Sequence, residues 1–169
     1  NLMLHYYYGN GKGKTSAAVG AAVRAAGQGF KVLFVQFFKN GSSGEVEPLK
    51  KLGVQYACSA EPYSLHRAPT KPEQERLAAA YQSLLQSALN QSQSFGLIVL
   101  DEAGDLPGLN LLPAKRLQAL LAGAKNCEIV VTGHRPVAEL CAIADYITAF
   151  NAVRHPFERG VTARRGVEF

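Results

Sequence analysis

The sequence has few cysteines, few charged residues and no long apolar run, and each shortage excludes a class of protein. Its three cysteines, Cys58, Cys127 and Cys141, lie far apart, without the paired spacing that zinc sites and disulfide frameworks use. No segment approaches the roughly 20 consecutive apolar residues of a membrane-spanning helix, and the first residues lack the layout of a signal peptide. We therefore expect reduced thiols in a soluble, cytoplasmic protein with no membrane partner.

The sequence also lacks three familiar kinds of catalytic centre. It contains no Ser-His-Asp arrangement around a nucleophile elbow, no histidine pair at metal-binding spacing and no cysteine in a reactive context. A nucleophile belonging to the protein is therefore not evident. This leaves the substrate as the source of the nucleophile.

Charged residues make up 18% and hydrophobic residues 47% of the 169 residues, so the chain can bury the core of one domain. We predict a single domain over 1–169 that ends in a basic tail. The formal net charge of +5 suits an anionic ligand, either a nucleic acid or a polyphosphate. Much of the excess lies in the tail, at Arg154, Arg159, Arg164 and Arg165. No recognised nucleic-acid-binding module surrounds these residues, so we do not expect nucleic acid as a partner.

Apolar runs and helical patterns alternate along the chain. The runs predict strands at 2–8, 31–38, 54–58, 97–100, 128–132 and 146–150, and the patterns predict helices from residue 15 and at 46–52, 72–92, 112–124 and 136–144. This rhythm predicts an α/β fold in which a mostly parallel sheet of about six strands is covered by helices on both faces, as in P-loop NTPases. The irregular segment 61–71 is typical of a ligand-binding loop.

The segment GNGKGKTS at 9–16 joins the first predicted strand to the first predicted helix. In a P-loop, glycines let backbone N–H groups surround phosphate oxygens, the lysine bridges phosphates and the hydroxyl reaches Mg²⁺. Gly11, Gly13, Lys14 and Thr15 fit these roles, although Tyr8 occupies the position of the first glycine in the usual pattern. The alternative is a glycine-rich turn without a ligand, which the flanking strand and helix make less favourable. We predict that this loop binds ATP.

Two carboxylates, Asp101 and Glu102, follow the apolar strand residues 97–100. They resemble the acidic end of a Walker B strand, which holds the Mg²⁺ of a nucleotide directly or through water. The alternative is that the pair caps the next helix or faces solvent. Together with the P-loop, the metal-binding interpretation is the better one.

The segment TGHR at 132–135 follows the fifth predicted strand, and ligands bind at the carboxyl ends of strands in open parallel sheets. His134 or Arg135 could therefore contact phosphate, the alternative being an exposed loop with surface charges. The tail residues Arg154, His155, Arg159, Arg164 and Arg165 could reach the same place or serve solubility alone.

These motifs together resemble the ATP:corrinoid adenosyltransferases, also called cob(I)yrinic acid a,c-diamide adenosyltransferases, nearly from end to end. The similar segments are GNGKGKTSAA at 9–18, VQFFKNG at 35–41, LDE at 100–102, ELCAIADYITAF at 139–150 and VRHPFERGVTARRGVEF at 153–169. The resemblance implies an enzyme that moves the 5′-deoxyadenosyl group of ATP onto the Co(I) of a corrinoid, such as cob(I)alamin, and releases triphosphate.

The resemblance also implies roles for individual residues. The ATP-binding residues would be Gly9, Asn10, Gly11, Lys12, Gly13, Lys14, Thr15, Ser16, Gln36, Lys39, His134, His155, Gly160 and Val161. Thr15, Asp101 and Glu102 would hold Mg²⁺ or Mn²⁺, and Lys14, Glu102 and Arg135 are the catalytic candidates. Two departures stand out: the relatives have TGR where this chain has TGHR, and the segment 59–71 lacks an aromatic pattern found in some of them. Tyr63, Leu65 and His66 are the remaining candidates for binding the corrinoid.

The resemblance also implies a homodimer and a flavoprotein or another reductant that supplies Co(I), and we expect both for this protein. Two alternatives remain. A P-loop kinase or ATPase would use the same loop but would transfer or hydrolyse the γ-phosphoryl group. A non-catalytic relative would bind ATP or corrinoid without forming a cobalt–carbon bond.

Overall fold

The computed structural model describes residues 3–61, 63, 68–154, 160 and 164–167. The elements in chain order are β1 Leu4–Tyr8, α1 Lys14–Gly27, β2 Val32–Gln36, α2 Val46–Lys51, β3 Gln55–Cys58, α3 Lys71–Asn90, η1 Ser92–Ser94, β4 Leu97–Asp101, η2 Ala103–Asp105, α4 Ala114–Ala122, β5 Glu128–Gly133, α5 Ala138–Cys141 and β6 Tyr146–Ala149. The described residues contain no helix that is both long and apolar enough to span a bilayer.

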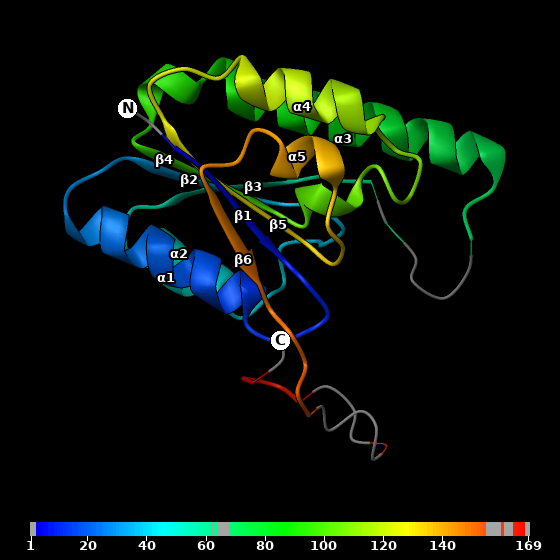
Figure 1. The fold of residues 1–169 in the computed structure, drawn as a ribbon. Coiled ribbons are helices and arrows are strands. Elements are labelled where there is room, and N and C mark those ends of the chain that lie inside the picture. Colours follow the sequence, from blue (N-terminus) through cyan, green and yellow to red (C-terminus); the bar gives the residue numbers. More distant parts are fainter. Residues whose placement is uncertain (1–2, 62, 64–67, 155–159, 161–163, 168–169) are drawn as a thin grey trace.

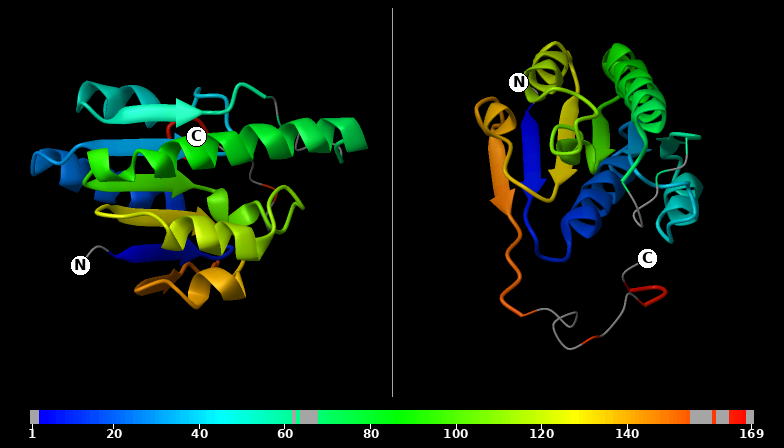
Figure 2. Two further views of the ribbon diagram at one scale, coloured as in Figure 1. Left: turned by 90° about the horizontal axis from the view of Figure 1, so that it is seen from above. Right: turned by 90° about the vertical axis from the view of Figure 1, so that its right-hand side faces the viewer.

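The six strands form one sheet in the order β3-β2-β4-β5-β1-β6, and every neighbouring pair is parallel. Figure 2 shows the strands side by side. The register pairs Gln36 with Asp101 and Tyr8 with Gly133, so the carboxyl ends of β2, β4, β1 and β5 meet at one edge of the sheet. The prediction of a parallel sheet of about six strands is confirmed.

Helices cover both faces of the sheet (Figure 1): α1 and α2 lie on one face, and α3, α4 and α5 lie on the other. Alternate residues of β2 pack against the helices on the two faces of the sheet. Val32 and Phe34 pack in the core under α1 and α2, whereas Leu33 and Val35 pack under α3. All five residues of β2 are buried, as an apolar run predicts for a central parallel strand.

Two predicted helices are shorter than the sequence pattern indicates. The helix predicted at 136–144 is only the four-residue α5, because the chain turns back after it and the N–H of Asp145 donates to the carbonyl of Leu4 at 2.8 Å. The helix predicted at 112–124 begins at Ala114, since Leu112 is buried in the core and Pro113 precedes the first turn.

Candidate active site

The loop between β1 and α1 owes its shape to its glycines. Gly9 and Gly13 have φ angles of 130° and 112°, which side chains other than glycine rarely adopt. The N–H of Gly11 donates to the carbonyl of Phe150 at 2.7 Å, just beyond β6. A Cβ atom on Gly9 or Gly11 would lie 2.2 Å or 2.7 Å from that same oxygen. The chain after β6 therefore supports the loop, and glycine is required at both positions.

Lys14 begins α1, directly after the loop. Its Nζ donates to the carbonyl of Gly11 at 2.9 Å, so its ammonium group lies over the loop. Burial lowers the pKa of Lys14, and the carboxylates of Asp105, Glu102 and Asp101 oppose this shift. A cation that is partly shielded from water interacts more strongly with an anion than an exposed one does.

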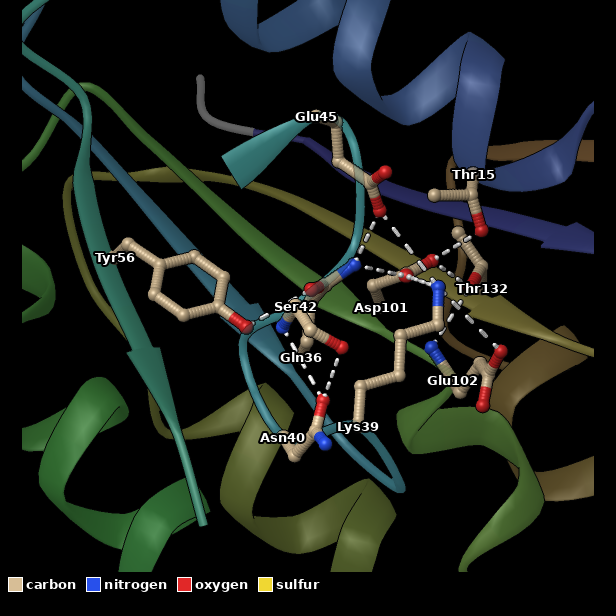
Figure 3. Close-up of polar contacts among 10 residues, drawn as sticks. All are labelled: Thr15, Gln36, Lys39, Asn40, Ser42, Glu45, Tyr56, Asp101, Glu102 and Thr132. Atoms are coloured by element: carbon tan, nitrogen blue, oxygen red, sulfur yellow. Dashed lines mark hydrogen bonds and ion pairs between the residues drawn. The ribbon is translucent and has the colours of Figure 1, made fainter. Parts of the chain in front are cut away.

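Asp101, the last residue of β4, is fully buried and is the centre of a polar network (Figure 3). Its Oδ1 accepts hydrogen bonds from the hydroxyls of Thr15 at 2.9 Å and Thr132 at 2.8 Å. Its Oδ2 accepts from Nε2 of Gln36 at 3.2 Å and Nζ of Lys39 at 3.3 Å. The ends of β4, β5 and β2 and the start of α1 thus hold one carboxylate in a fixed orientation.

A second group of side chains surrounds this centre. Nε2 of Gln36 donates to Glu45 at 2.6 Å, and the hydroxyl of Tyr56 donates to the amide oxygen of Gln36 at 2.9 Å. Nζ of Lys39 also lies 3.7 Å from Glu45 and 3.9 Å from Glu102. Burial lowers the pKa of Lys39, but the carboxylates of Asp101, Glu102 and Glu45 together outweigh burial and raise it. The single charge of Lys39 therefore interacts with three acidic groups and offsets part of their negative charge.

Glu102 follows β4 in the left-handed conformation, with φ 68°. Its N–H donates to the hydroxyl of Thr132 at 2.8 Å, which fixes the turn. Burial raises the pKa of the Glu102 carboxyl to about 7; Asp101 adds to the rise, and Lys39 and His134 oppose it. A cation placed beside this carboxyl would favour its ionised form.

The donor atoms beside the loop suit a hard divalent cation. The hydroxyl of Thr15 and the carboxylates of Asp101 and Glu102 supply only oxygen, which Mg²⁺ and Mn²⁺ prefer. Within the described ranges, no group of three or more His, Cys, Asp or Glu side chains could hold a metal by itself. Further ligands would have to come from phosphate oxygens and water, and Mg²⁺ is usually bound in this way.

Three cavities meet at Glu102, which lines all of them. The loop cavity, about 160 Å³, is lined mainly by residues 12–16, Thr132 and His134. The acidic cavity, about 440 Å³, shares Thr15 and Ser16 and extends to Lys39, Glu45 and Val167. The apolar cavity, about 330 Å³, lies on the other side of Glu102 and is lined by Phe38, Tyr63, Glu102, Asp105, Gly108, Leu109, His134 and Arg135.

The two basic residues after β5 lie differently. His134 lines both the loop cavity and the apolar cavity. Its N–H and its Nδ1 lie 2.7 Å from the two carboxylate oxygens of Asp105, and this hydrogen bond is the main reason that the pKa of the imidazole is raised. Arg135 lines the apolar cavity, and its carbonyl accepts a hydrogen bond from Tyr6 at 2.6 Å.

Most of the residues predicted from the sequence come together here. Lys12, Gly13, Lys14, Thr15, Ser16, Lys39, Glu102 and His134 line the loop and acidic cavities. Gln36 is fully buried, so it supports Asp101 from beneath rather than facing a cavity, and the side chain of Asn10 accepts the N–H of Ala152 at 3.2 Å. Gly160 is an exposed glycine with φ 74°. Leu65, His66, His155 and Val161 lie outside the described residues.

The sequence reasoning missed several residues of the site, including the following four. Glu45 and Tyr56 belong to the network, and Asp105 and Leu109 line the apolar cavity. Asp105 follows Glu102 by three residues in a short helical turn, a spacing that places both carboxylates near one another. No comparable pattern marks the other three, because they come from loops and a strand edge that only the folded chain brings together.

The glycine loop between a strand and a helix, with Thr15 hydrogen-bonded to the aspartate at the end of β4, defines a P-loop nucleotide-binding protein of the α/β class. The family model for ATP:corrinoid adenosyltransferase BtuR/CobO/CobP matches residues 1–169. The chain therefore belongs to the ATP:corrinoid adenosyltransferase family.

Individual relatives agree with this assignment. The corrinoid adenosyltransferase of Escherichia coli (strain K12) is 33% identical over 170 residues, covering 96% of this chain and 83% of that protein. The corrinoid adenosyltransferase of Pseudomonas aeruginosa is 33% identical over 172 residues, covering 99% and 83%. The solved structure of the RadB recombinase has a TM-score of 0.52 at 19% identity over 91% of this chain and 76% of that one, a likeness of fold alone.

Proposed function

We propose that this protein transfers the 5′-deoxyadenosyl group of ATP to the Co(I) of a reduced corrinoid and releases triphosphate. The observation that supports this most is the placement of two different cavities on the two sides of Glu102. One contains the P-loop and suits a triphosphate, and the other has Phe38, Tyr63 and Leu109 in its wall and suits an apolar ring system. A chain of this family needs both substrates within reach of each other.

The reaction needs little covalent chemistry from the protein. The electron pair of Co(I) forms the bond to C5′ of the ribose while the C5′–O bond breaks, and its electrons leave on triphosphate. The chain holds C5′ in line between cobalt and the leaving oxygen, which is catalysis by orientation. Lys14 and the N–H groups of the loop stabilise the negative charge that grows on the triphosphate.

A divalent cation, Mg²⁺ or Mn²⁺, completes this proposal. Thr15, Asp101 and Glu102 would hold it, because they supply oxygen donors at the edge of the loop. Bound there, the cation would neutralise charge on the triphosphate. Lys39, which contacts Asp101 and lies near Glu102, would keep these carboxylates ionised and in place.

The apolar cavity is the place where we expect the corrinoid. Tyr63 packs against Phe38 with ring centroids 4.9 Å apart, so these aromatic rings form part of one wall. Leu65 and His66 remain predictions. The proposal covers both cob(I)alamin and cob(I)yrinic acid a,c-diamide, since the reacting Co(I) is common to them.

Three further features belong to the proposal: a homodimer, a flavoprotein or other reductant that supplies Co(I), and a cytoplasmic location. Among the described residues Cys58, Cys127 and Cys141 are free thiols, as a reducing compartment maintains them.

The products test the proposed function. We expect Mg-ATP and a chemically reduced corrinoid to yield triphosphate and a light-sensitive adenosylated corrinoid in equal amounts. ADP and orthophosphate would instead identify a kinase or ATPase. Saturable ATP binding by calorimetry, with no cobalt–carbon bond formed under strong reductant, would identify a non-catalytic binding protein.

A further inference from the structure

Asp105 and His134 form a close pair at the end of β5, beside the loop and apolar cavities. One carboxylate makes two contacts with one residue: Oδ1 accepts the N–H of His134, and Oδ2 lies 2.7 Å from Nδ1. Two contacts fix both the backbone and the ring of His134. Nε2 is then the ring nitrogen that remains for a ligand, since no hydrogen bond joins it to a residue in the described ranges.

The surrounding backbone leaves little freedom for this pair to move. A Cβ atom on Gly104 would lie 2.9 Å from the carbonyl oxygen of Thr132, and one on Gly133 would lie 3.1 Å from Cα of Gly104. The turn that carries Asp105 and the end of β5 are therefore in close contact. Asp105, with 16% of its side chain exposed, is held beneath His134, whose side chain is 60% exposed.

His134, and not Arg135, lines the loop cavity, where the proposed function places the triphosphate. His134 lines the loop cavity together with Lys14 and Glu102. Arg135 lines the apolar cavity instead, and its carbonyl is fixed by the hydroxyl of Tyr6. The close contact between Gly104 and Gly133 opposes the shift of the backbone that would bring Arg135 into the loop cavity.

We propose that His134, oriented by Asp105, is a second cationic contact for the triphosphate of ATP, and that Asp105 is a positioning residue. The identity of this ligand rests on the function proposed above. The hydrogen bond that the imidazole donates to Asp105 raises the pKa of His134 and favours the imidazolium, whereas burial and nearby Lys14 lower this pKa. A charged Nε2–H donor suits a phosphate oxygen.

The test measures binding of Mg-ATP, and of inorganic triphosphate with Mg²⁺, by calorimetry without corrinoid. H134Q and D105N should each raise the Kd for ATP about tenfold, because each weakens one charge-assisted hydrogen bond. In the H134R background, D105N should change the Kd by less than about twofold, since a guanidinium stays charged without a carboxylate partner. Equal effects of D105N in both backgrounds would overturn the proposal, as would an unchanged Kd in H134Q.

Two controls keep the test decisive. D145N removes a carboxylate that accepts the N–H of Leu4 at the opposite edge of the sheet, and it should leave the Kd unchanged. If D105N does not fold, H134R must restore the affinity that H134Q loses, and failure to restore it would refute the proposal. The binding assay contains no corrinoid, so its outcome does not depend on adenosyl transfer. A natural protein that failed to transfer the adenosyl group would contradict the proposed function and leave the binding results unchanged.

Discussion

The cavities on the two sides of Glu102 are built in different ways. The loop and acidic cavities rest on hydrogen bonds between the ends of β2, β4, β5 and the start of α1, with Asp101 fully enclosed. The apolar cavity rests on side chains from connections, such as Phe38, Tyr63 and Leu109. A buried charge requires hydrogen-bond partners in fixed positions, whereas an apolar ring system requires only an apolar surface of complementary shape. We therefore expect substitutions on the two sides to affect different substrates.

The largest expected effect is that of K14A. Loss of this ammonium should lower kcat/KM by about 10²–10³-fold or more, because it removes a charge directed at the leaving group. The free energy of unfolding should change by less than about 1 kcal/mol, since in the described part of the chain the side chain of Lys14 donates a hydrogen bond only to the carbonyl of Gly11. Steady-state assays and urea denaturation measure the two effects. K51A, an exposed lysine on α2, is the control, and similar activity in both variants would contradict the role of Lys14.

D101N should disrupt the hydrogen-bond network that supports the loop and acidic cavities, which together form the phosphate side of the site. The new amide group would face the donors Nε2 of Gln36 and Nζ of Lys39, so a buried acceptor is lost. We expect about 2–4 kcal/mol less free energy of unfolding and a weaker dependence of ATP binding on Mg²⁺. A loss below about 1 kcal/mol in urea denaturation would show that the hydrogen bonds accepted by Asp101 contribute little to stability. D145N again controls for the loss of one carboxylate.

Much of the phosphate side could be predicted from the sequence. Gly11, Gly13, Lys14 and Thr15 have fixed spacing within one loop, and Asp101 follows an apolar strand, so local patterns reveal them. The parallel sheet then brings the two motifs together, because the carboxyl ends of β1 and β4 lie at one edge. The order of the strands was not needed for this prediction.

The apolar side could be predicted far less well. Leu109 lies in a turn after η2 and Phe38 has φ 61° just beyond β2, and neither position follows a periodic pattern. Asp105 contacts His134 across 29 positions of the chain, a pairing that only the packing of η2 against β5 creates. The ends of α4 and α5 were also predicted wrongly, since tertiary contacts rather than periodicity set them.

E102Q tests the raised pKa of the Glu102 carboxyl, which lines all three cavities. Burial raises the pKa of Glu102 in the folded protein from 4.5 to about 7, so the folded state favours its protonated form. As the pH rises from 4.5 to 7, ionisation of Glu102 therefore lowers the free energy of unfolding of the natural protein. Glutamine does not ionise, so the variant does not lose this free energy. E102Q should match the natural protein near pH 4.5 and exceed it by about 1–3 kcal/mol above pH 7 in urea denaturation. A difference that stays constant from pH 5 to pH 8 would rule out the raised pKa, and E47Q on α2 controls for the loss of one exposed charge.

L109A should have the smallest effect and separates the two sides most directly. Leu109 is 40% exposed and lines the apolar cavity, so its truncation removes contact surface with little cost in stability. We expect KM for the corrinoid to rise about three- to tenfold, as the loss of part of an apolar contact predicts, and KM for ATP to stay within about twofold. L52A, which truncates an exposed leucine at the end of α2, should change neither KM. A rise in KM for ATP alone would assign the apolar cavity to the adenosine rather than to the corrin ring, and equal rises for both substrates would mean that the two sides of Glu102 are one site.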